Sequence, residues 1–264
     1  MSSMQIGMGI KEEIMQNGAF ALIDCLGFRG LWRNGREQLI AKLRLINENL
    51  ENPDTYDLIV KDVSKHNVQV KLLSDTIAIG VSSKTGDGDK INDLITLTGI
   101  VMRIMDIFLG NEPHILLRGC ITHGEYLTEK NFLVGPAVDK TAEFMESAEG
   151  SFVWFLPQAT SIIDEFCESK VKSVKEGDDV ILRAVNAFMP KFEVPIKNSH
   201  FLKSRLVNPI YNKMIDESEL VIAKTKKVMD VDTMSVWMKR QHTLEFLDMC
   251  KDANAKLHEL TIVG

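Results

Sequence analysis

The stretch Ala21-Leu22-Ile23-Asp24-Cys25-Leu26-Gly27-Phe28 is an apolar strand that ends in a carboxylate, a glycine and an aromatic residue. This pattern is typical of a chain that places one charged side chain at the rim of a buried sheet. A second run, Val68–Gly80, repeats the pattern around Asp75. Two lone aspartates, each within strand residues, indicate a shared cation. Oxygen ligands select hard ions, here Mg²⁺ or Mn²⁺.

The length and composition limit the classes of protein to consider. The chain has 264 residues, enough for one large domain or for one domain with a helical appendage. Hydrophobic residues make up 45% and charged residues 26%, as in an ordinary soluble globular protein. The net charge of −6 argues against a broad nucleic-acid surface but is compatible with a local cationic pocket for a nucleotide.

The cysteines and the N-terminal residues predict a cytoplasmic protein. The four cysteines are far apart and form no metal-spaced pair, so we interpret them as reduced residues, mostly in the core. Residues 1–11 show no basic-then-apolar signal pattern. No uninterrupted apolar run approaches the roughly 20 residues of a membrane span. We therefore expect neither a membrane nor a nucleic acid as a partner.

Apolar periodicity and turn residues predict the elements of the first 110 residues. They are a lead-in over 1–18, a strand over 19–26, a helix from Gly30 that ends at Asn52-Pro53-Asp54, β-type alternation over Tyr56–Val63, a turn at His66-Asn67, hairpin arms over Val68–Leu73 and Thr76–Ser82, a polar glycine-rich loop over Lys84–Asp89 and a helix over Ile91–Leu109.

The same signals predict the elements of the remaining chain. They are a strand over His114–Thr122, a short hairpin of Glu125–Leu127 and Asn131–Val134, a helix from Gly135-Pro136 to about Ala148, a strand over Ser151–Leu156, a helix over Pro157–Ser169, a strand over Val180–Val185, an irregular basic segment over Lys191–Asn198 and two helices between Asn212 and Leu260 that break near Asp230–Asp232. This order predicts an α+β fold of β-α-β-β-α-β type, with helices on one face of a largely antiparallel sheet. We expect a main domain over 19–190 and a basic segment with a helical extension over 191–264.

Four segments resemble, in order, motifs of the class III nucleotidyl cyclases, the adenylate and guanylate cyclase family. They are Ile23–Phe28 (Asp-Ile-x-Gly-Phe), Lys71–Asp75 (Lys-x-x-Gly-Asp), Arg118–Glu125 (Gly-Ile-x-x-Gly) and Gly135–Glu146 (Gly-x-x-Val-Asn-x-Ala-x-Arg-Leu-Glu). The resemblance covers residues 18–160 and implies a ferredoxin-like cyclase core.

The resemblance also implies a metal site and a homodimer. In the family, two Mn²⁺ or Mg²⁺ ions are held by the residues that correspond to Asp24 and Asp75 and by the carbonyl at Cys25. The ions lower the basicity of the ribose 3′-hydroxyl and neutralise charge on the phosphates. The N–H groups of Leu26-Gly27-Phe28 would face the phosphates at the start of the next helix. The active sites would form at the interface between two protomers.

The sequence departs from the family at the residues that read the base and stabilise the transition state. The base-reading positions correspond to Lys71 and Phe132, and a phenylalanine cannot make the polar contact. Neither alignment of the next helix preserves the family's Asn–Arg pair. The pair corresponds to Asp139 and Glu143 or, with a one-residue gap, to Lys140 and Phe144. The chain is therefore either an inactive relative or a member of a branch with another pocket.

A branch with matching motifs is the stand-alone pyrimidine nucleotide cyclases of bacterial anti-phage (Pycsar) signalling. Gly27–Trp32 and Arg118–Ile121 resemble their motifs. This resemblance implies production of cyclic UMP from UTP, favoured over cyclic CMP from CTP, with release of pyrophosphate. The product would act on a separate effector protein and kill the infected cell. The alternatives are an adenylate or guanylate cyclase with an atypical pocket and an inactive cyclase-fold module that binds nucleotides or a partner.

The acidic and arginine site residues each have a structural alternative. Asp24 could instead cap the next helix, and Asp75 could be a turn residue, but their pairing favours a metal. Arg118 could replace the missing family arginine or form an ordinary salt bridge at its strand. We expect a core role for Cys25 and a structural role for His123.

The lysines leave more alternatives open. Lys71 could face the base or the phosphates, or be a solvated strand residue. Lys140 is a candidate nucleotide-binding residue on the helix after Gly135. One member of a basic group in the C-terminal part could bind the triphosphate tail, with Lys197 as the candidate. The group comprises Lys191, Lys197, Lys203 and Arg205.

Overall fold

The computed structural model describes residues 15–51, 65–84, 89–110, 112–129, 132–173, 178–198, 200–211, 213–229 and 233–262. Its strands are β1 (Gln16–Cys25), β2 (His66–Leu73), β3 (Thr76–Ser83), β4 (Leu117–Thr128), β5 (Leu133–Val134), β6 (Val153–Phe155), β7 (Lys191–Ile196) and β8 (His200–Arg205). Its helices are α1 (Phe28–Asn34), α2 (Arg36–Glu51), α3 (Lys90–Gly110), α4 (Pro136–Phe144), α5 (Pro157–Ser173), α6 (Asp178–Phe188), α7 (Ile215–Val228) and α8 (Met234–Ile262).

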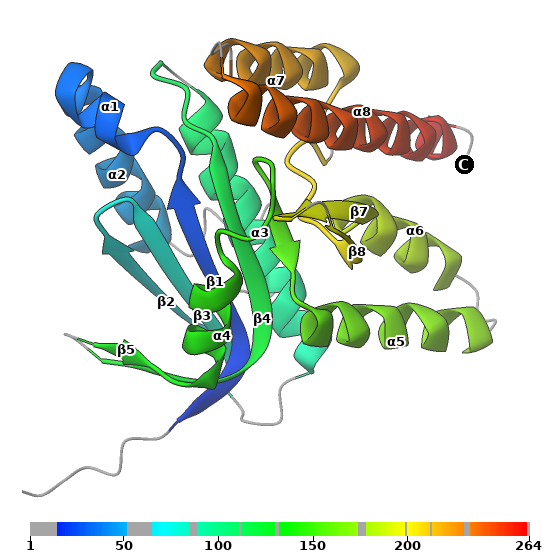
Figure 1. Cartoon of the computed structure of the whole chain (residues 1–264). Helices are drawn as coiled ribbons and strands as arrows, with labels where there is room; N and C mark the ends of the chain where they lie inside the picture. Colours follow the sequence, from blue (N-terminus) through cyan, green and yellow to red (C-terminus); the bar gives the residue numbers. More distant parts are fainter. Residues whose placement is uncertain are drawn as a thin grey trace, which may run out of the picture.

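The main sheet has six strands in the order β2-β3-β1-β4-β5, with β6 beside β4 (Figure 1). β6 runs parallel to β4, and the other strand pairs are antiparallel. The first four strands, with α1 and α2 after β1 and α3 after β3, form the β-α-β-β-α-β unit. The predicted α+β fold with a largely antiparallel sheet is confirmed.

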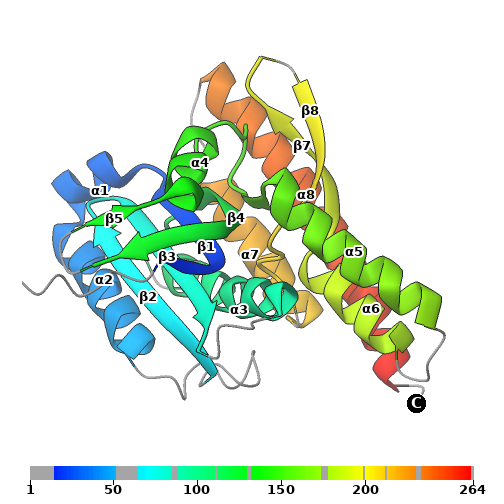
Figure 2. The ribbon, with the colours of Figure 1, turned by 90° about the horizontal axis from the view of Figure 1, so that it is seen from below.

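Strand β1 lies at the centre of the sheet and is covered on both faces. Ala21 and Ile23 belong to the large core cluster that includes much of α3. The alternate residues Phe20 and Leu22 pack instead with Ala137 of α4. Figure 2 shows α3 and α4 on opposite sides of the sheet. The helices α2 and α3 of the β-α-β-β-α-β unit therefore cover one face, as expected, and α4, which follows this unit, covers the second face.

The predicted hairpin of β2 and β3 is confirmed, but its start was predicted wrongly. His66 and Asn67 were expected to form a turn, whereas they pair with Ser83 and Ser82 as the first residues of β2. This pairing gives their main-chain groups hydrogen-bond partners in a longer ladder. At the other end, Ser74 has φ 61°, a conformation that tight hairpin turns require.

Three other predictions differ from the structure. The predicted strand Val180–Val185 is part of helix α6, whose Val185 and Phe188 are buried at helical spacing. The segment predicted to be irregular, Lys191–Asn198, contains β7, which pairs with β8 along its whole length. The two strands expected on either side of Gly124 form one continuous strand, β4, because pairing with β1 continues through the glycine. The expectation for Tyr56–Val63 lies outside the described residues, as do residues 85–88 of the predicted loop.

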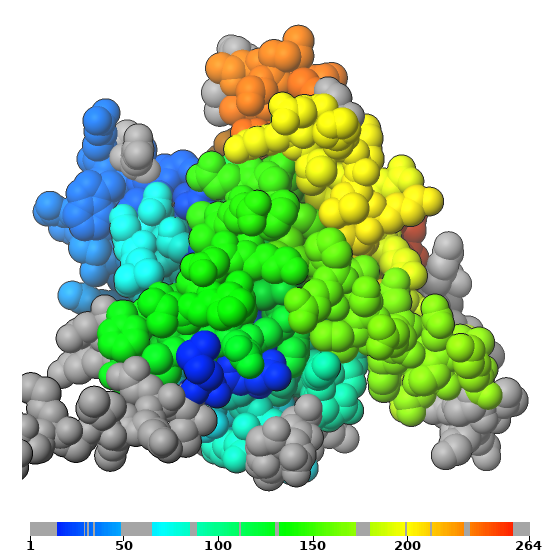
Figure 3. All heavy atoms as spheres, turned by 60° about the horizontal axis from the view of Figure 1, so that its bottom comes forward, coloured from blue at the N-terminus to red at the C-terminus, as the bar shows by residue number. Residues whose placement is uncertain are grey.

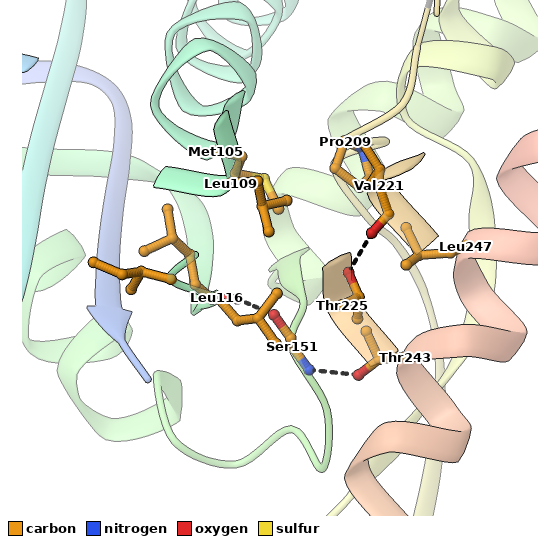
Figure 4. A pocket seen from close by; sticks show the side chains of 11 residues that line it. Met105, Leu109, Leu116, Ser151, Pro209, Val221, Thr225, Thr243 and Leu247 are labelled. Carbon is orange, nitrogen blue, oxygen red and sulfur yellow. Dashed lines mark hydrogen bonds between the residues drawn. The ribbon is translucent and has the colours of Figure 1, made fainter. Parts of the chain in front are cut away.

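The two predicted C-terminal helices are confirmed as α7 and α8. Their Val221 and Phe246 share a second core cluster with Trp154 of β6 and Leu206, so they pack directly on the edge of the sheet. Figure 4 shows the junction of α3, α7 and α8, which encloses a cavity of only about 10 Å³. The domain boundary at residue 190 stays a prediction. None of the helices in the described residues is long and apolar enough to cross a membrane.

A buried lysine ties α2 to the end of α3. Lys42 is 6% exposed and donates hydrogen bonds to the carbonyls of Ile107 and Phe108, at 3.1 and 3.0 Å. We expect Lys42→Met to lower the free energy of unfolding by about 1–3 kcal/mol, because two buried carbonyls lose a charged donor. Urea denaturation measures the change. The exposed control, Lys90→Met, should change the stability by less than about 0.5 kcal/mol, and an equal loss in both variants would contradict the prediction.

Candidate functional site

The candidate site lies where β1 ends, between the β2–β3 turn and the start of β4. The strand register places Asp24 opposite Arg118 of β4 on one side and opposite Thr76 of β3 on the other. Because side chains alternate along a strand, Asp24 faces the same side of the sheet as Leu22, the side that α4 covers. The aspartate predicted from the opening stretch therefore lies at the rim of the sheet, as expected.

Asp24 forms an ion pair with Arg118. Oδ2 of Asp24 accepts hydrogen bonds from Nε and Nη2 of Arg118, at 3.1 and 3.0 Å. The two side chains are only 13% and 15% exposed. Burial raises the pKa of Asp24 above its ordinary value, and the charges of Asp75 and Glu146 add to this, while the guanidinium opposes it. A cation at this carboxyl group favours its charged form.

Asp75 lies beside the end of β1. Its main-chain carbonyl accepts a hydrogen bond of 2.9 Å from the N–H of Cys25, which fixes the β2–β3 turn against β1. Its charge also raises the pKa of both Asp24 and Cys25. The structure thus brings the two predicted aspartates close enough for their like charges to interact. For Cys25, burial is the main cause that raises the thiol pKa to about 12, which agrees with a core role.

The donor atoms at this edge fit a hard divalent ion. Within the described residues, no three His, Cys, Asp or Glu side chains are grouped to hold a metal, so carboxylates alone do not form a complete site. The available donors are the carboxylates of Asp24 and Asp75 and the carbonyl of Cys25. Both hydrogen bonds from Arg118 go to Oδ2 of Asp24, and neither uses Oδ1. A divalent ion would relieve the repulsion between the two carboxylates, and it would complete its shell with phosphate and water oxygens.

Arg118 also contacts an acidic residue that the sequence did not single out. Its Nη2 lies 3.1 Å from Oε1 of Glu146, and Oε2 of Glu146 lies 3.8 Å from Nζ of Lys197. Lys197 lies in the turn between β7 and β8, where its N–H donates to the carbonyl of Ser147. Figure 3 shows the β7–β8 hairpin, in yellow, against the green segment that includes α4. The only signal for Glu146 was its place at the end of the fourth motif.

The other members of the basic C-terminal group have structural partners. Arg205 is 1% exposed and donates to Asp164, so the idea that it binds the triphosphate tail is wrong. Lys191 pairs with the same Asp164, and Lys203 pairs with Glu193. Of the four basic residues proposed for the tail, Lys197 is the one that joins the network of Asp24 and Arg118.

The segment after β1 turns sharply into α1. Gly27 has φ 78°, a left-handed conformation that favours glycine. The N–H of Leu26 donates to the carbonyl of Leu116 at 2.8 Å, so it is already used. Of the N–H groups expected to face the phosphates, those of Gly27 and Phe28 remain candidates. The ring of Phe28 stacks on Trp32.

A cavity of about 410 Å³ lies on the α4 side of the sheet, next to Asp24. Both predicted base-reading residues, Lys71 and Phe132, line it, and so does Thr76, the β3 partner of Asp24. Nζ of Lys71 donates to the carbonyl of Glu129, the residue that follows β4. The remaining lining residues are apolar: Leu22, Leu73, Leu133, Val138 and Met145. The size is within the range of small-molecule sites.

Three further expectations concern residues outside this cluster. Lys140 lies on α4 and is not part of the ion-pair network of Asp24, Arg118 and Glu146. Phe144, one of the positions for the missing transition-state residues, packs against the second core cluster. His123 is buried, with Nε2 3.4 Å from Asp93, in agreement with a structural role.

No protein-family model and no curated protein match the sequence. Several solved structures are similar, at low identity. A double mutant of the guanylyl cyclase domain of the RhoGC fusion protein from the aquatic fungus Blastocladiella emersonii is 13% identical, with a TM-score of 0.47, and the match covers 73% of this chain and 95% of that one. An adenylate/guanylate cyclase/hydrolase from Silicibacter pomeroyi is 16% identical, with a TM-score of 0.40 and coverages of 73% and 96%. A class III adenylyl cyclase-like ATP-binding protein from Pseudomonas aeruginosa is 14% identical, with a TM-score of 0.40 and coverages of 56% and 35%.

Proposed function

We propose that this chain is a metal-dependent nucleotidyl cyclase. The observation that carries the proposal is the placement of Asp24 and Asp75 at one edge of the sheet, beside a cavity that Lys71 lines. In the reaction, the ribose 3′-oxygen attacks the α-phosphorus of a nucleoside triphosphate and loses its proton to solvent. The bond from that phosphorus to the bridging oxygen breaks, and a 3′,5′-cyclic monophosphate and pyrophosphate are formed.

The residues of the site take complementary roles in this proposal. Asp24, Asp75 and the carbonyl of Cys25 would hold two Mn²⁺ or Mg²⁺ ions, which supply charge neutralisation at the phosphates and lower the pKa of the attacking hydroxyl. The N–H groups of Gly27 and Phe28 bind phosphate oxygens. The basic side chains position the triphosphate electrostatically. These are Arg118, Lys140 and Lys197.

The cavity beside Asp24 supports a pyrimidine substrate. Phe132 lines it where purine cyclases place a polar base-reading residue, and most of the lining is apolar. A ring stacked on Phe132 with one polar contact to Lys71 suits a small base, and we favour UTP over CTP. In this proposal the enzyme acts as a homodimer and its cyclic product activates a separate effector in antiviral defence, as in the branch that the motifs resemble.

An assay with each of the four ribonucleoside triphosphates and Mn²⁺ tests the proposal directly. Mass spectrometry should detect 3′,5′-cyclic UMP as the main product, with less cyclic CMP and with pyrophosphate in equal amount. A cyclic purine as the main product would support an adenylate or guanylate cyclase with an atypical pocket. Nucleotide binding without pyrophosphate release would support an inactive module, which the missing Asn–Arg pair favours. No cyclic product from any of the four would refute the cyclase.

The cavity also predicts a change in substrate affinity. We expect Phe132→Ala to raise the KM for the pyrimidine triphosphate about 3- to 10-fold with little change in kcat, because it removes apolar contact that is the same in the ground and transition states. Phe201→Ala is a matched control, since Phe201 is exposed on β8. A fall in kcat at constant KM, or an equal effect of both variants, would contradict a role for Phe132 in base binding.

A further inference from the structure

The guanidinium of Arg118 is shared between two carboxylates. Its Nη2 lies 3.0 Å from Oδ2 of Asp24 and 3.1 Å from Oε1 of Glu146. Its Nε donates to Asp24. Asp24 is a proposed metal ligand, whereas Glu146 is 57% exposed and has no role in the proposed reaction. Arg118 therefore links Asp24, the proposed metal ligand, to Glu146, an acidic residue outside the proposed metal site.

We propose that Arg118 competes with the divalent ion for the carboxylate of Asp24, and that Arg118 remains paired with Glu146 when the ion binds. The inference rests on the proposed metal site and adds a positioning residue to it. Without a metal, the guanidinium neutralises Asp24. With a metal, it loses its hydrogen bonds to Asp24 and keeps its bond to Glu146.

Electrostatics explains why the two cations compete. The carboxylate of Asp24 is largely buried and lies within reach of the charges of Asp75 and Glu146, so it requires a positive partner. A guanidinium and a divalent ion on the same carboxylate repel each other strongly in such a partly buried place. Binding of the ion therefore includes the free energy of moving Arg118 away from Asp24.

Glu146 lowers this free-energy cost because it already forms an ion pair with Nη2 of Arg118, the nitrogen that also donates to Asp24. Without Glu146, a displaced guanidinium would lose its acceptors in a site where Arg118 is only 15% exposed. Lys197 acts in the opposite direction: it lies 3.8 Å from the other oxygen of Glu146 and weakens the hold on Arg118. Lys197 and Glu146 are both more than half exposed, so solvent screens their interaction and its effect is small.

The experiment is a titration of the protein with Mn²⁺ alone at pH 7.5, with free Mn²⁺ measured by electron paramagnetic resonance. We expect Arg118→Ala to lower the Kd for Mn²⁺ about 10-fold and Glu146→Gln to raise it about 3- to 10-fold, which corresponds to a coupling of about 0.7 to 1.4 kcal/mol. Lys197→Met should change the Kd by less than about 3-fold.

The double variant Arg118→Ala/Glu146→Gln separates this proposal from a general charge effect. If Glu146 acts through Arg118, Glu146→Gln should have almost no effect on the Kd once Arg118 is absent. If Glu146 only adds negative potential, its effect should be the same in both backgrounds. Thermal unfolding of each variant checks that the protein is folded.

Three outcomes would overturn the inference: an unchanged or raised Kd in Arg118→Ala, additive effects in the double variant, or no Mn²⁺ binding by the wild-type protein at millimolar concentration. The cyclase proposal fails separately, on the absence of any cyclic product. Cyclic product together with additive effects would refute the cation exchange and leave the proposed activity intact.

Discussion

Asp24→Asn is expected to lower the kcat of cyclic nucleotide formation at least about 100-fold, the size of effect found when one electrostatic group of a catalytic site is removed. The substitution keeps the shape of the side chain and its ability to accept a hydrogen bond from Arg118. It removes the negative charge that a divalent ion requires. Asp75→Asn should have a similar effect, because both carboxylates lie at the same edge of the sheet. The measurement is product formed per enzyme with saturating Mn²⁺ and substrate.

The fold should tolerate the loss of charge at Asp24. The pKa of Asp24 is raised in the folded protein, so the native state holds this proton more tightly than the unfolded chain does. Its contribution favours the fold below the unfolded pKa and is lost as the pH rises through the folded pKa. At pH 7 the charge of Asp24 therefore does not stabilise the fold, and Asp24→Asn should not lower the melting temperature.

The control for both variants is Asp248→Asn, the same chemical change at an exposed position of α8. It should retain the wild-type kcat. Retention of more than half the wild-type activity in Asp24→Asn, with Asp248→Asn also active, would refute a metal role for Asp24. A large loss of activity in both Asp24→Asn and Asp248→Asn would attribute the effect to folding. A large fall in melting temperature for Asp24→Asn would do the same.

Local signals were sufficient for the parts of the fold that depend on neighbouring residues. The alternation before Asp24 and the turn residues around Asp75 predicted β1 and the hairpin, since strand faces and tight turns depend on a few adjacent residues. The prediction of a strand over Val180–Val185 was wrong because its apolar run, Val180–Leu182, is short, and short apolar runs are ambiguous between strand and helix. This run belongs to a helix whose next buried positions, Val185 and Phe188, follow at helical spacing.

The sequence left Arg118 with two alternatives, and strand register accounts for the ion pair with Asp24 that the structure shows. Arg118 lies 94 residues after Asp24, and their ion pair exists because β1 and β4 place them opposite each other. Glu146, in the turn after α4, contacts Arg118, and Lys197, in the β7–β8 turn, contacts Glu146. No local pattern specifies such a contact, because it depends on how separate elements pack. The motifs thus identified Asp24 and Asp75, whereas the cation that lies on Asp24 became visible only in the structure.

Arg205→Met is expected to lower the free energy of unfolding by about 3–5 kcal/mol, the usual cost of removing one partner of a buried ion pair. Arg205 is 1% exposed at the end of β8. Its Nε donates to Asp164 at 2.7 Å, and its Nη1 donates to Asn186 at 3.1 Å and to the carbonyl of Met189 at 2.6 Å. The substitution leaves these three acceptors without this donor, and methionine provides no N–H or O–H group to replace it. Urea denaturation at pH 7 measures the change.

The pH dependence of stability provides a second measurement on the same ion pair. Burial tends to raise the pKa of Asp164, but hydrogen bonds from Lys191 and Arg205 outweigh it and lower the pKa below its ordinary value. A lowered pKa means that Asp164 stabilises the fold above its unfolded pKa and that this stability is lost as the pH falls through the folded pKa. Arg205→Met should weaken this acid-dependent loss. Lys203→Met, a control on the same strand at a side chain that is 87% exposed, should change stability by less than about 0.5 kcal/mol. A loss below about 1 kcal/mol in Arg205→Met would contradict the assignment, because a buried guanidinium with several partners cannot be removed at so small a cost.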